Sequence, residues 1–363
     1  MILNRRGFVA ASSAALLSGC ATIGKQPSAL GCTPLPPVRV DESRIIRTIA
    51  GLRPYRASGF VVRREPLGDK VLVHNYGHGG AGITLSWGSS RLAADLGLAG
   101  HNGPVAIIGS GVMGLSTARL VQEAGFPVTI YTAALPPDTT SAVAGGQVSP
   151  FGHYSEDAVT PEWRAQFAAA MAYSWQRFQL LLGDEYGVRW LPTYEETRRT
   201  EPTELEEFMP DWRVLSPAEH PFPLEDVVRY RTMYVETPRF MAELTSEILR
   251  SGGRIRMRRF NSLAELTDLP ERLIFNCTGI GAAQLVGDAA LMPVRGQLAV
   301  LAPQPEVRYA VAGSSGYMFP RADGILLGGT FERGEWDSTP QPADIARIVA
   351  SHQAFFDGLR CAA

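Results

Sequence analysis

The most regular pattern of apolar and polar positions surrounds a cluster of glycines in the first half of the chain. Four apolar residues at 105–108 lead directly into the glycine-rich segment 109–114, and apolar residues at helical spacing follow to about position 124. This order predicts a strand, a tight turn and a helix. A further apolar run at 127–131 predicts the next strand, so the region has the strand-helix-strand pattern of a Rossmann-type sheet.

Patterns elsewhere predict a second glycine turn and a second sheet. Residues 73–88 predict a strand, a glycine-dense turn and a helix from about 84 to 96. Residues 160–250 show helical periodicity, with aromatic residues spaced as in a packed core rather than a cofactor site. The arginine-rich segment 254–260 alternates as a half-exposed strand does, so its arginines are only weak evidence for a polyanionic partner. Short apolar runs between turn residues predict further strands at 298–301, 317–319 and 325–327.

Composition limits the class of protein without identifying it. The chain has 363 residues, of which 45% are hydrophobic, a length that suits two domains sharing a core. Its formal net charge of −2 provides no general attraction to nucleic acid, so we expect no nucleic-acid partner.

The first twenty residues differ in kind from the rest. Arg5 and Arg6 precede an apolar stretch at 9–17, which runs into Leu-Ser-Gly-Cys ending at Cys20. This pattern predicts a twin-arginine export signal over 1–19 with a lipoprotein cleavage box, a lipid on Cys20, and a tether over 20–38. The protein would then be exported and lipid-anchored to a bacterial membrane, facing the periplasm. An uncleaved anchor or a chance pair of arginines is the alternative.

The three glycines of the first turn are spaced as a dinucleotide-binding turn requires. Gly109 would permit the tight bend, Gly111 would let a pyrophosphate approach the backbone, and Gly114 would let the helix pack on the strand. An ordinary strand-to-helix connection is the alternative. The acidic residue that usually binds the ribose is missing, because Thr-Ala-Ala stands at 132–134, and this argues against NAD as the permanent cofactor.

Several further motifs together resemble one known family. They stand at 51–56 (GLRPYR), 75–88 (NYGHGGAGITLSWG), 105–118, 138–146, 275–279, 295–297 and 327–331 (LGGTF). The set resembles the D-amino-acid oxidase family of FAD-dependent oxidoreductases. In that family the first two motifs come last, so the chain resembles a circular permutant. The fold class implied is α/β, with a Rossmann-type FAD-binding domain and a substrate domain built on a mixed or antiparallel sheet.

The resemblance also implies where the domains lie. The catalytic unit spans 39–363. The FAD-binding parts are about 70–155 and 252–290, and the discontinuous substrate domain comprises about 39–69, 156–250 and 291–363.

The same resemblance assigns FAD-binding residues. They come from both glycine turns, from a hydroxyl-rich segment after the second Rossmann strand, and from two later strand ends. They are Gly79, Gly80, Gly82, Ile83, Thr84, Gly109, Gly111, Val112, Met113, Gly114, Thr139, Thr140, Ser141, Gly146, Gln147, Phe260 and Thr278.

Two residues would hold the substrate. The resemblance places Arg53 and Tyr317 on the arginine and tyrosine that bind a substrate carboxylate, a pairing that suits a guanidinium. Without the resemblance, the sequence favours a surface arginine at Arg53 and a core tyrosine at Tyr317. Gly313 stands where vertebrate members carry a second tyrosine, so a small, glycine-rich segment at 310–315 predicts a more open entrance and a different side-chain preference.

The implied reaction is oxidative deamination of a D-amino acid. The Cα hydrogen leaves as hydride to flavin N5, and the imino acid hydrolyses to a 2-oxo acid and ammonia. Oxygen then reoxidises the flavin and is reduced to hydrogen peroxide. The protein contributes mainly orientation. An amino-acid dehydrogenase of the same fold that passes electrons to a membrane carrier, or a non-catalytic flavin-binding protein, is the alternative. No metal is expected, since His74 and His78 lie in a glycine turn.

Two of the four cysteines remain after the others are assigned. Cys20 is assigned to the lipid and Cys277 to a buried strand, which leaves Cys32 and Cys361 near the two ends of the folded part. We expect them to form a disulfide across the permuted termini in an oxidising compartment, although two free cysteines remain open.

Overall fold

A six-stranded sheet forms one half of the molecule. The computed structural model describes residues 32–149, 151–199 and 204–361. The sheet has the strand order β2 (Val61–Leu67), β3 (Lys70–Tyr76), β10 (Leu273–Asn276), β4 (Val105–Ile108), β5 (Val128–Thr132) and β9 (Arg254–Met257). Only β2 runs antiparallel to its neighbour. The carboxyl ends of the other five strands therefore meet at one edge.

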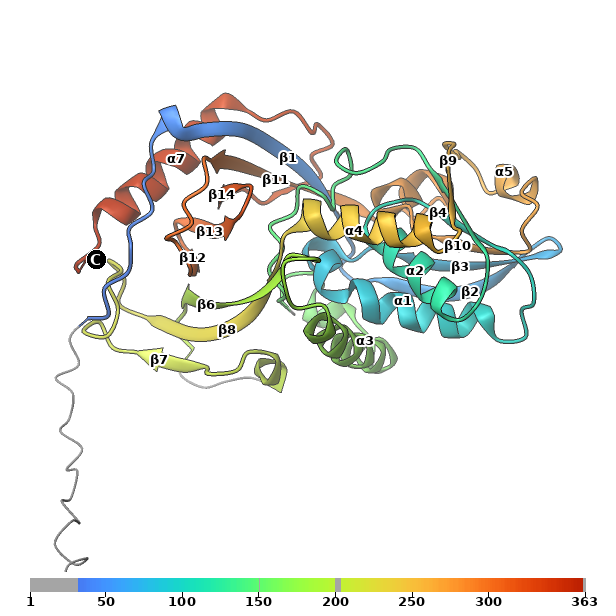
Figure 1. The fold of residues 1–363 in the computed structure, drawn as a ribbon, viewed down its shortest axis with the longest axis horizontal. Coiled ribbons are helices and arrows are strands. Elements are labelled where there is room, and N and C mark those ends of the chain that lie inside the picture. The colour runs from blue at the N-terminus through green and yellow to red at the C-terminus, as the bar shows by residue number, and fades with distance from the viewer. Residues whose placement is uncertain (1–31, 150, 200–203, 362–363) are drawn as a thin grey trace, which may run out of the picture.

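Both faces of this sheet are covered, which explains the uninterrupted apolar run of its central strand. In β4, Val105 and Ile107 belong to the core on one face, whereas Ala106 and Ile108 belong to the core on the other. The first face packs against the long helices α1 (Gly82–Leu98), α2 (Val112–Glu123) and α4 (Thr237–Arg250), and α3 (Pro161–Leu180) packs on α1 (Figure 1). The short helices α5 (Ala264–Thr267) and α6 (Ala282–Leu285) lie on the other side.

A nine-stranded sheet forms the other half. Its order is β1 (Ile45–Tyr55), β11 (Met292–Leu301), β14 (Gly324–Gly328), β13 (Gly316–Arg321), β12 (Ala310–Gly313), β6 (Val188–Glu196), β8 (Val227–Val235) and β7 (Arg213–Leu215), with β15 (Glu332–Arg333) beside β11. Among its pairs only β6 with β12 is parallel. Helix α7 (Pro342–Asp357) covers this sheet, and apolar residues of α7 and of the strands form a second core (Figure 1).

The described structure departs from the sequence prediction in two places. Residues 160–250 are not helical throughout, because β6, β7 and β8 lie between α3 and α4. Long-range pairing with β12 overrides the local pattern there. In addition, β2 pairs with β3 in the six-stranded sheet, although the predicted domain boundary near residue 69 places it with the substrate part.

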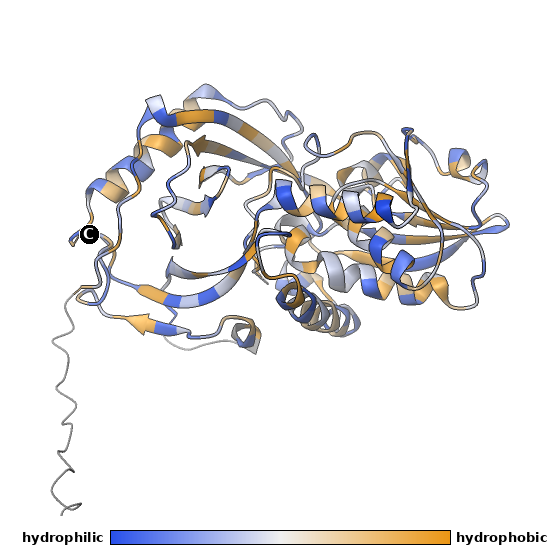
Figure 2. Ribbon diagram, in the orientation of Figure 1, coloured by the Kyte–Doolittle hydropathy of each residue, from blue (hydrophilic) through white to orange (hydrophobic). Residues whose placement is uncertain are grey.

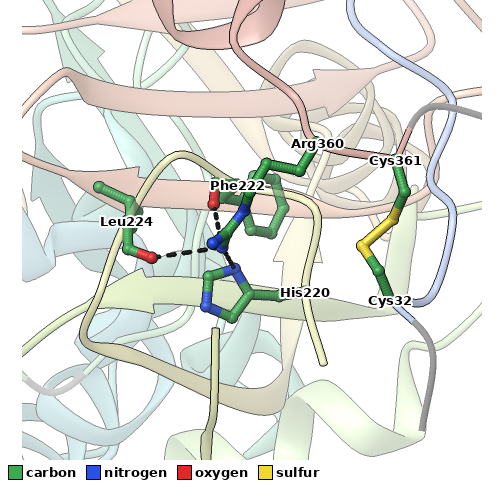
Figure 3. Close-up of a disulfide and its surroundings, with 6 residues drawn as sticks. All are labelled: Cys32, His220, Phe222, Leu224, Arg360 and Cys361. Carbon is green, nitrogen blue, oxygen red and sulfur yellow. Dashed lines mark hydrogen bonds between the residues drawn. A yellow bond between two sulfur atoms is a disulfide. The ribbon is translucent and has the colours of Figure 1, made fainter. Parts of the chain in front are cut away.

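The predicted disulfide is confirmed. Cys32 and Cys361 are bonded, with 6.4 Å between their Cα atoms, and join residues 329 positions apart in sequence. Beside the bond, the Arg360 guanidinium donates to the carbonyl oxygen of Phe222 at 2.6 Å and faces His220 (Figure 3). The start and the end of the described chain are thereby held at one place on the nine-stranded half.

The predicted signal and most of the tether lie outside the described residues. Within the described part, no helix has the length and apolar content that crossing a bilayer requires. Figure 2 shows hydrophilic and hydrophobic positions mixed along each helix. The described end of the predicted tether packs on the protein, because Val38 is buried in the core beside α7.

Candidate cofactor and substrate site

The first glycine turn joins β4 to α2 and depends on the absence of a side chain at two positions. Gly109 has φ +109°, and a Cβ there would lie 2.5 Å from the carbonyl oxygen of Cys277. A Cβ on Gly114 would lie 1.9 Å from the carbonyl oxygen of Gly109. Helix α2 therefore packs directly on the turn, and its N-terminal backbone N–H groups face the carboxyl edge of the sheet, where a phosphate would be favoured.

The second glycine turn lies at the same edge. It follows β3, which is separated from β4 only by β10, and all three strands are parallel. Gly79 has φ +52°, and a Cβ there would lie 3.3 Å from the Cα of His153. Two turns that are about thirty residues apart in sequence thus become neighbours, because parallel strands end together.

A cavity of about 530 Å³ opens between this edge and the nine-stranded sheet. Most of the predicted FAD-binding residues line it: Gly79, Gly80, Gly82, Ile83, Gly109, Gly111, Val112, Met113, Thr139, Thr140, Ser141, Gly146, Gln147, Phe260 and Thr278. Two predicted residues do not. Gly114 lies behind the turn, and Thr84 is buried in α1, where its hydroxyl accepts a hydrogen bond from the Ser149 N–H at 3.0 Å. Both can act only through the residues they support.

Three hydroxyl-bearing residues follow β5 at the cavity wall. The Ser141 hydroxyl accepts a hydrogen bond from the Val112 N–H at 3.0 Å and so caps α2. The Thr139 hydroxyl is buried yet has no hydrogen-bond partner among the described residues. A buried hydroxyl without a partner at a cavity wall fits a polar ligand group placed beside it.

Arg53 and Tyr317 meet in the wall of the cavity, although they lie on β1 and β13 of the nine-stranded sheet. Two glycines make room for them. A Cβ on Gly296 would lie 2.4 Å from the Arg53 guanidinium, and a Cβ on Gly328 would lie 2.1 Å from the Tyr317 ring. Both glycines belong to the motifs that carried the family resemblance.

The environment keeps the Tyr317 hydroxyl protonated. Burial raises the pKa of Tyr317 above its ordinary value, while the neighbouring Arg53 charge acts in the opposite direction. The Tyr317 ring stacks on Phe319, with 4.5 Å between ring centroids. Beside the Arg53 guanidinium, this fixed phenol forms a pair of donors suited to one carboxylate.

The structure places the segment predicted to form the entrance in the nine-stranded sheet. Residues 310–313 form β12, which pairs with both β13 and β6. The Ser314 N–H donates to the Glu196 carboxylate at 2.6 Å, and Gly313 does not line the cavity. A Cβ on Gly313 would lie 2.8 Å from Glu196, so a larger residue there would displace that side chain.

The end of the cavity beside β5 and β9 lacks the usual ribose carboxylate, as Ala133 and Ala134 predict. Two arginines that sequence reasoning missed, Arg258 and Arg259, line this end together with Phe260. The Arg258 guanidinium lies 4.5 Å from the centre of the Phe260 ring. The signal was available, because the segment 254–260 was predicted as a strand; only its parallel pairing with β5 brings its end to the cavity.

His74 and His78 make separate contacts. The His74 ring lies 2.9 Å from the Glu65 carboxylate, and His78 Nε2 lies 2.9 Å from the Ser89 hydroxyl. Burial lowers the pKa of His78 to about 3, so the ring is neutral. His74 therefore belongs to the strand before the second glycine turn, whereas His78 connects that turn to α1.

Comparison with known proteins identifies the family. A model of a family described as FAD-dependent oxidoreductase, DAO, matches residues 31–96 and 104–363. The chain belongs to the DAO family. The D-amino-acid oxidase of Rubrobacter xylanophilus is 31% identical to this DAO member over 262 residues, covering 70% of this chain and 77% of the relative. Human D-aspartate oxidase is also 31% identical, over 68% of this chain and 74% of the relative.

Solved structures show the same DAO fold. Iminodiacetate oxidase from Chelativorans sp. BNC1 matches with a TM-score of 0.52 and 20% identity, over 70% of this chain and 79% of that one. Glycine oxidase from Geobacillus kaustophilus matches with a TM-score of 0.51 and 17% identity, over 71% and 80%. The circular permutation stays a prediction, because these matches do not give the order of the segments in the family.

FAD is the cofactor of this DAO-family chain, and the cavity fits it. The turn at 109–114 would hold the pyrophosphate, since the absence of Cβ atoms leaves its backbone open. The Thr139 hydroxyl would form a hydrogen bond with a polar group of the cofactor. Phe260 and Arg258 would lie at the adenosine end, and the turn at 79–82 at the flavin end. These individual roles remain predictions.

Proposed function

We propose that the chain is an FAD-dependent D-amino-acid oxidase, which converts a D-amino acid, oxygen and water into a 2-oxo acid, ammonia and hydrogen peroxide. The observation that carries the proposal is the convergence of Arg53 and Tyr317, which interact with each other in the wall of the cavity. The relatives named D-amino-acid oxidase support the substrate class.

The protein's part in this reaction is binding and orientation. The Arg53 guanidinium would donate two hydrogen bonds to the substrate carboxylate, and the Tyr317 hydroxyl would donate to the same group. Bound FAD supplies the two-electron oxidation of the Cα–N bond. Because two groups hold the carboxylate, the substrate cannot rotate freely in the site. Its Cα hydrogen therefore has a fixed orientation.

The charges that line the cavity favour substrates with uncharged side chains. Arg53 is the cation beside Tyr317. It would bind the α-carboxylate and so would not pair with an acidic side chain of the substrate. The other lining arginines, Arg258 and Arg259, follow β9 at the adenosine end. Arg53 and Tyr317 are here called the clamp, and the apolar residues Ile49, Leu298 and Phe319 line the cavity beside its tyrosine. We therefore expect neutral D-amino acids to react faster than D-aspartate.

Anaerobic reduction of the flavin tests this assignment. The purified holoprotein should be yellow, and D-leucine or D-methionine should bleach it without oxygen, whereas L-leucine should not. D-aspartate should bleach it more slowly. In air the same substrates should yield peroxide in equal amount to the 2-oxo acid. Bleaching without peroxide would instead assign a dehydrogenase, and no bleaching by any D-amino acid would refute the proposal.

We also propose that the protein is exported and anchored by a lipid on Cys20. The Cys32–Cys361 disulfide supports this, because disulfides persist mainly in oxidising compartments. Export in the folded state would allow FAD to bind before translocation. Cys20→Ser should move the protein from the membrane fraction to the soluble periplasmic fraction, and replacing Arg5 and Arg6 by lysine should leave it in the cytoplasm. A soluble wild-type protein would contradict the anchor.

A further inference from the structure

A buried arginine at the end of β13 takes no part in the clamp or in the lining of the cavity. The Arg321 side chain is only 2% exposed. Its Nε and Nη2 donate to the two carboxylate oxygens of Asp323 at 2.7 and 2.6 Å. This two-point pair fixes the plane of the guanidinium and leaves Nη1 directed elsewhere.

The remaining donor reaches a segment of the FAD site. Arg321 Nη1 donates to the carbonyl oxygen of Ala144 and to the Thr237 hydroxyl, both at 3.0 Å. Ala144 belongs to residues 138–147, here called the cofactor loop, which lines the cavity over most of its length. The Thr237 hydroxyl donates in turn to the carbonyl oxygen of Ala142 at 2.8 Å.

Strand β13 faces this loop along its whole length. Residues 317, 319 and 321 alternate with their neighbours, so they share one face of the strand. Tyr317 belongs to the clamp. Phe319 packs on Gly145, where a Cβ would lie 2.9 Å from its ring, and Arg321 holds the carbonyl of Ala144. Phe319 and Arg321, which lie on the same strand as Tyr317, therefore set the distance between Tyr317 and the cofactor loop.

We propose that Arg321 is a positioning residue, which holds the cofactor loop against the strand that carries Tyr317. It keeps the wall of the FAD cavity in place and fixes the flavin relative to the carboxylate clamp. The kinetic part of this inference rests on the proposed oxidase activity, whereas the FAD-binding part does not.

Arg47 provides a matched control. It also binds Asp323, at 2.5 Å, but its side chain is 43% exposed and it makes no hydrogen bond to the cofactor loop in the described structure. Exposed ion pairs contribute little. Arg47→Ala therefore removes a cation from the same carboxylate and leaves the loop untouched.

The test is FAD affinity, measured by the quenching of flavin fluorescence when apoprotein is titrated with FAD. Arg321→Ala should raise the Kd for FAD about tenfold or more, because a buried charged donor leaves the loop. Arg321→Lys should lie between this variant and wild type, since a lysine cannot serve both Asp323 and Ala144. Arg47→Ala should stay within about twofold of wild type.

Kinetics with D-leucine give a second readout, which a purely structural role would not move. In FAD-saturated Arg321→Ala, kcat should fall about tenfold or more while KM changes less than about threefold, because the clamp is intact but the flavin is displaced. If Arg321→Ala does not fold, Thr237→Val tests the same contact and should raise the Kd for FAD by about threefold or more.

Several outcomes would decide the matter. A folded Arg321→Ala that binds FAD as tightly as Arg47→Ala overturns the proposal, and so does an unchanged Thr237→Val if Arg321→Ala cannot be made. A wild-type protein that shows no turnover refutes the oxidase assignment alone. In that case weaker FAD binding by Arg321→Ala still supports the anchoring of the loop.

Discussion

The two halves of the molecule build their parts of the cavity in different ways. The six-stranded half contributes backbone at the carboxyl ends of parallel strands, and its decisive residues are glycines in two short turns. The nine-stranded half contributes two side chains, Arg53 and Tyr317, from strands far apart in sequence. Recognition by backbone is local and leaves no room for a Cβ at Gly109 or Gly114, whereas recognition by side chains depends on long-range pairing.

This difference predicts that variants of the two halves fail differently. A change in a glycine turn should remove the cofactor and leave the clamp without a partner. A change in the clamp should leave a fully yellow protein that cannot hold its substrate.

The largest effect is expected for Arg53→Ala. Loss of the cation that pairs with a buried carboxylate should lower kcat/KM with D-leucine by about 1,000-fold, with a raised KM. The flavin spectrum and FAD content should match those of wild type. An unchanged KM, or loss of FAD, would break the assignment of Arg53 to the substrate half.

A large effect of the opposite kind is expected for Gly114→Ala. The new methyl group would overlap the carbonyl oxygen of Gly109, so α2 must shift and the Kd for FAD should rise about 100-fold or more. Gly103→Ala is the matched control, since its Cβ would meet nothing closer than 3.7 Å. Equal FAD titrations of the two variants would contradict the close packing of helix on turn.

A smaller effect is expected for Tyr317→Phe. Loss of one hydrogen bond to a charged group should raise KM about tenfold or more while FAD stays bound. Because the pKa of Tyr317 is raised, its hydroxyl should stay protonated to higher pH than an ordinary tyrosine. In wild type, ionisation of Tyr317 should therefore not lower kcat/KM near pH 10. A decline near pH 10 that is present in wild type and absent from Tyr317→Phe would contradict this expectation.

The smallest effect on the site is expected for Cys361→Ser. Loss of the disulfide should lower the free energy of unfolding by about 2–5 kcal/mol, as removing a long-range crosslink usually does. Since neither cysteine lines the cavity, kcat/KM should stay within about twofold of wild type. Denaturation with and without reductant provides the measurement. Reductant should destabilise wild type and leave the variant unchanged.

The strand-turn-helix at 105–124 was predictable because its apolar run, its glycine spacing and its helical periodicity all lie within one short segment. The conformation of Gly109 and the close contact of Gly114 follow from the turn itself. The prediction failed over 160–250, where β6 and β8 form through pairing with each other and with β12. The two arginines beside Phe260 were missed for the same reason, because only the pairing of β9 with β5 places them at the cavity.

By itself, the sequence determined the backbone features of this protein: the glycine turns, the strands that precede them, and the two cysteines able to join the ends. These depend on conformations that a few adjacent residues impose. Only the tertiary structure decided that Arg53 meets Tyr317, that Gly296 and Gly328 make room for them, and that Arg321 reaches the cofactor loop. Such contacts join distant strands, and sheet pairing, which no short segment specifies, sets their distances.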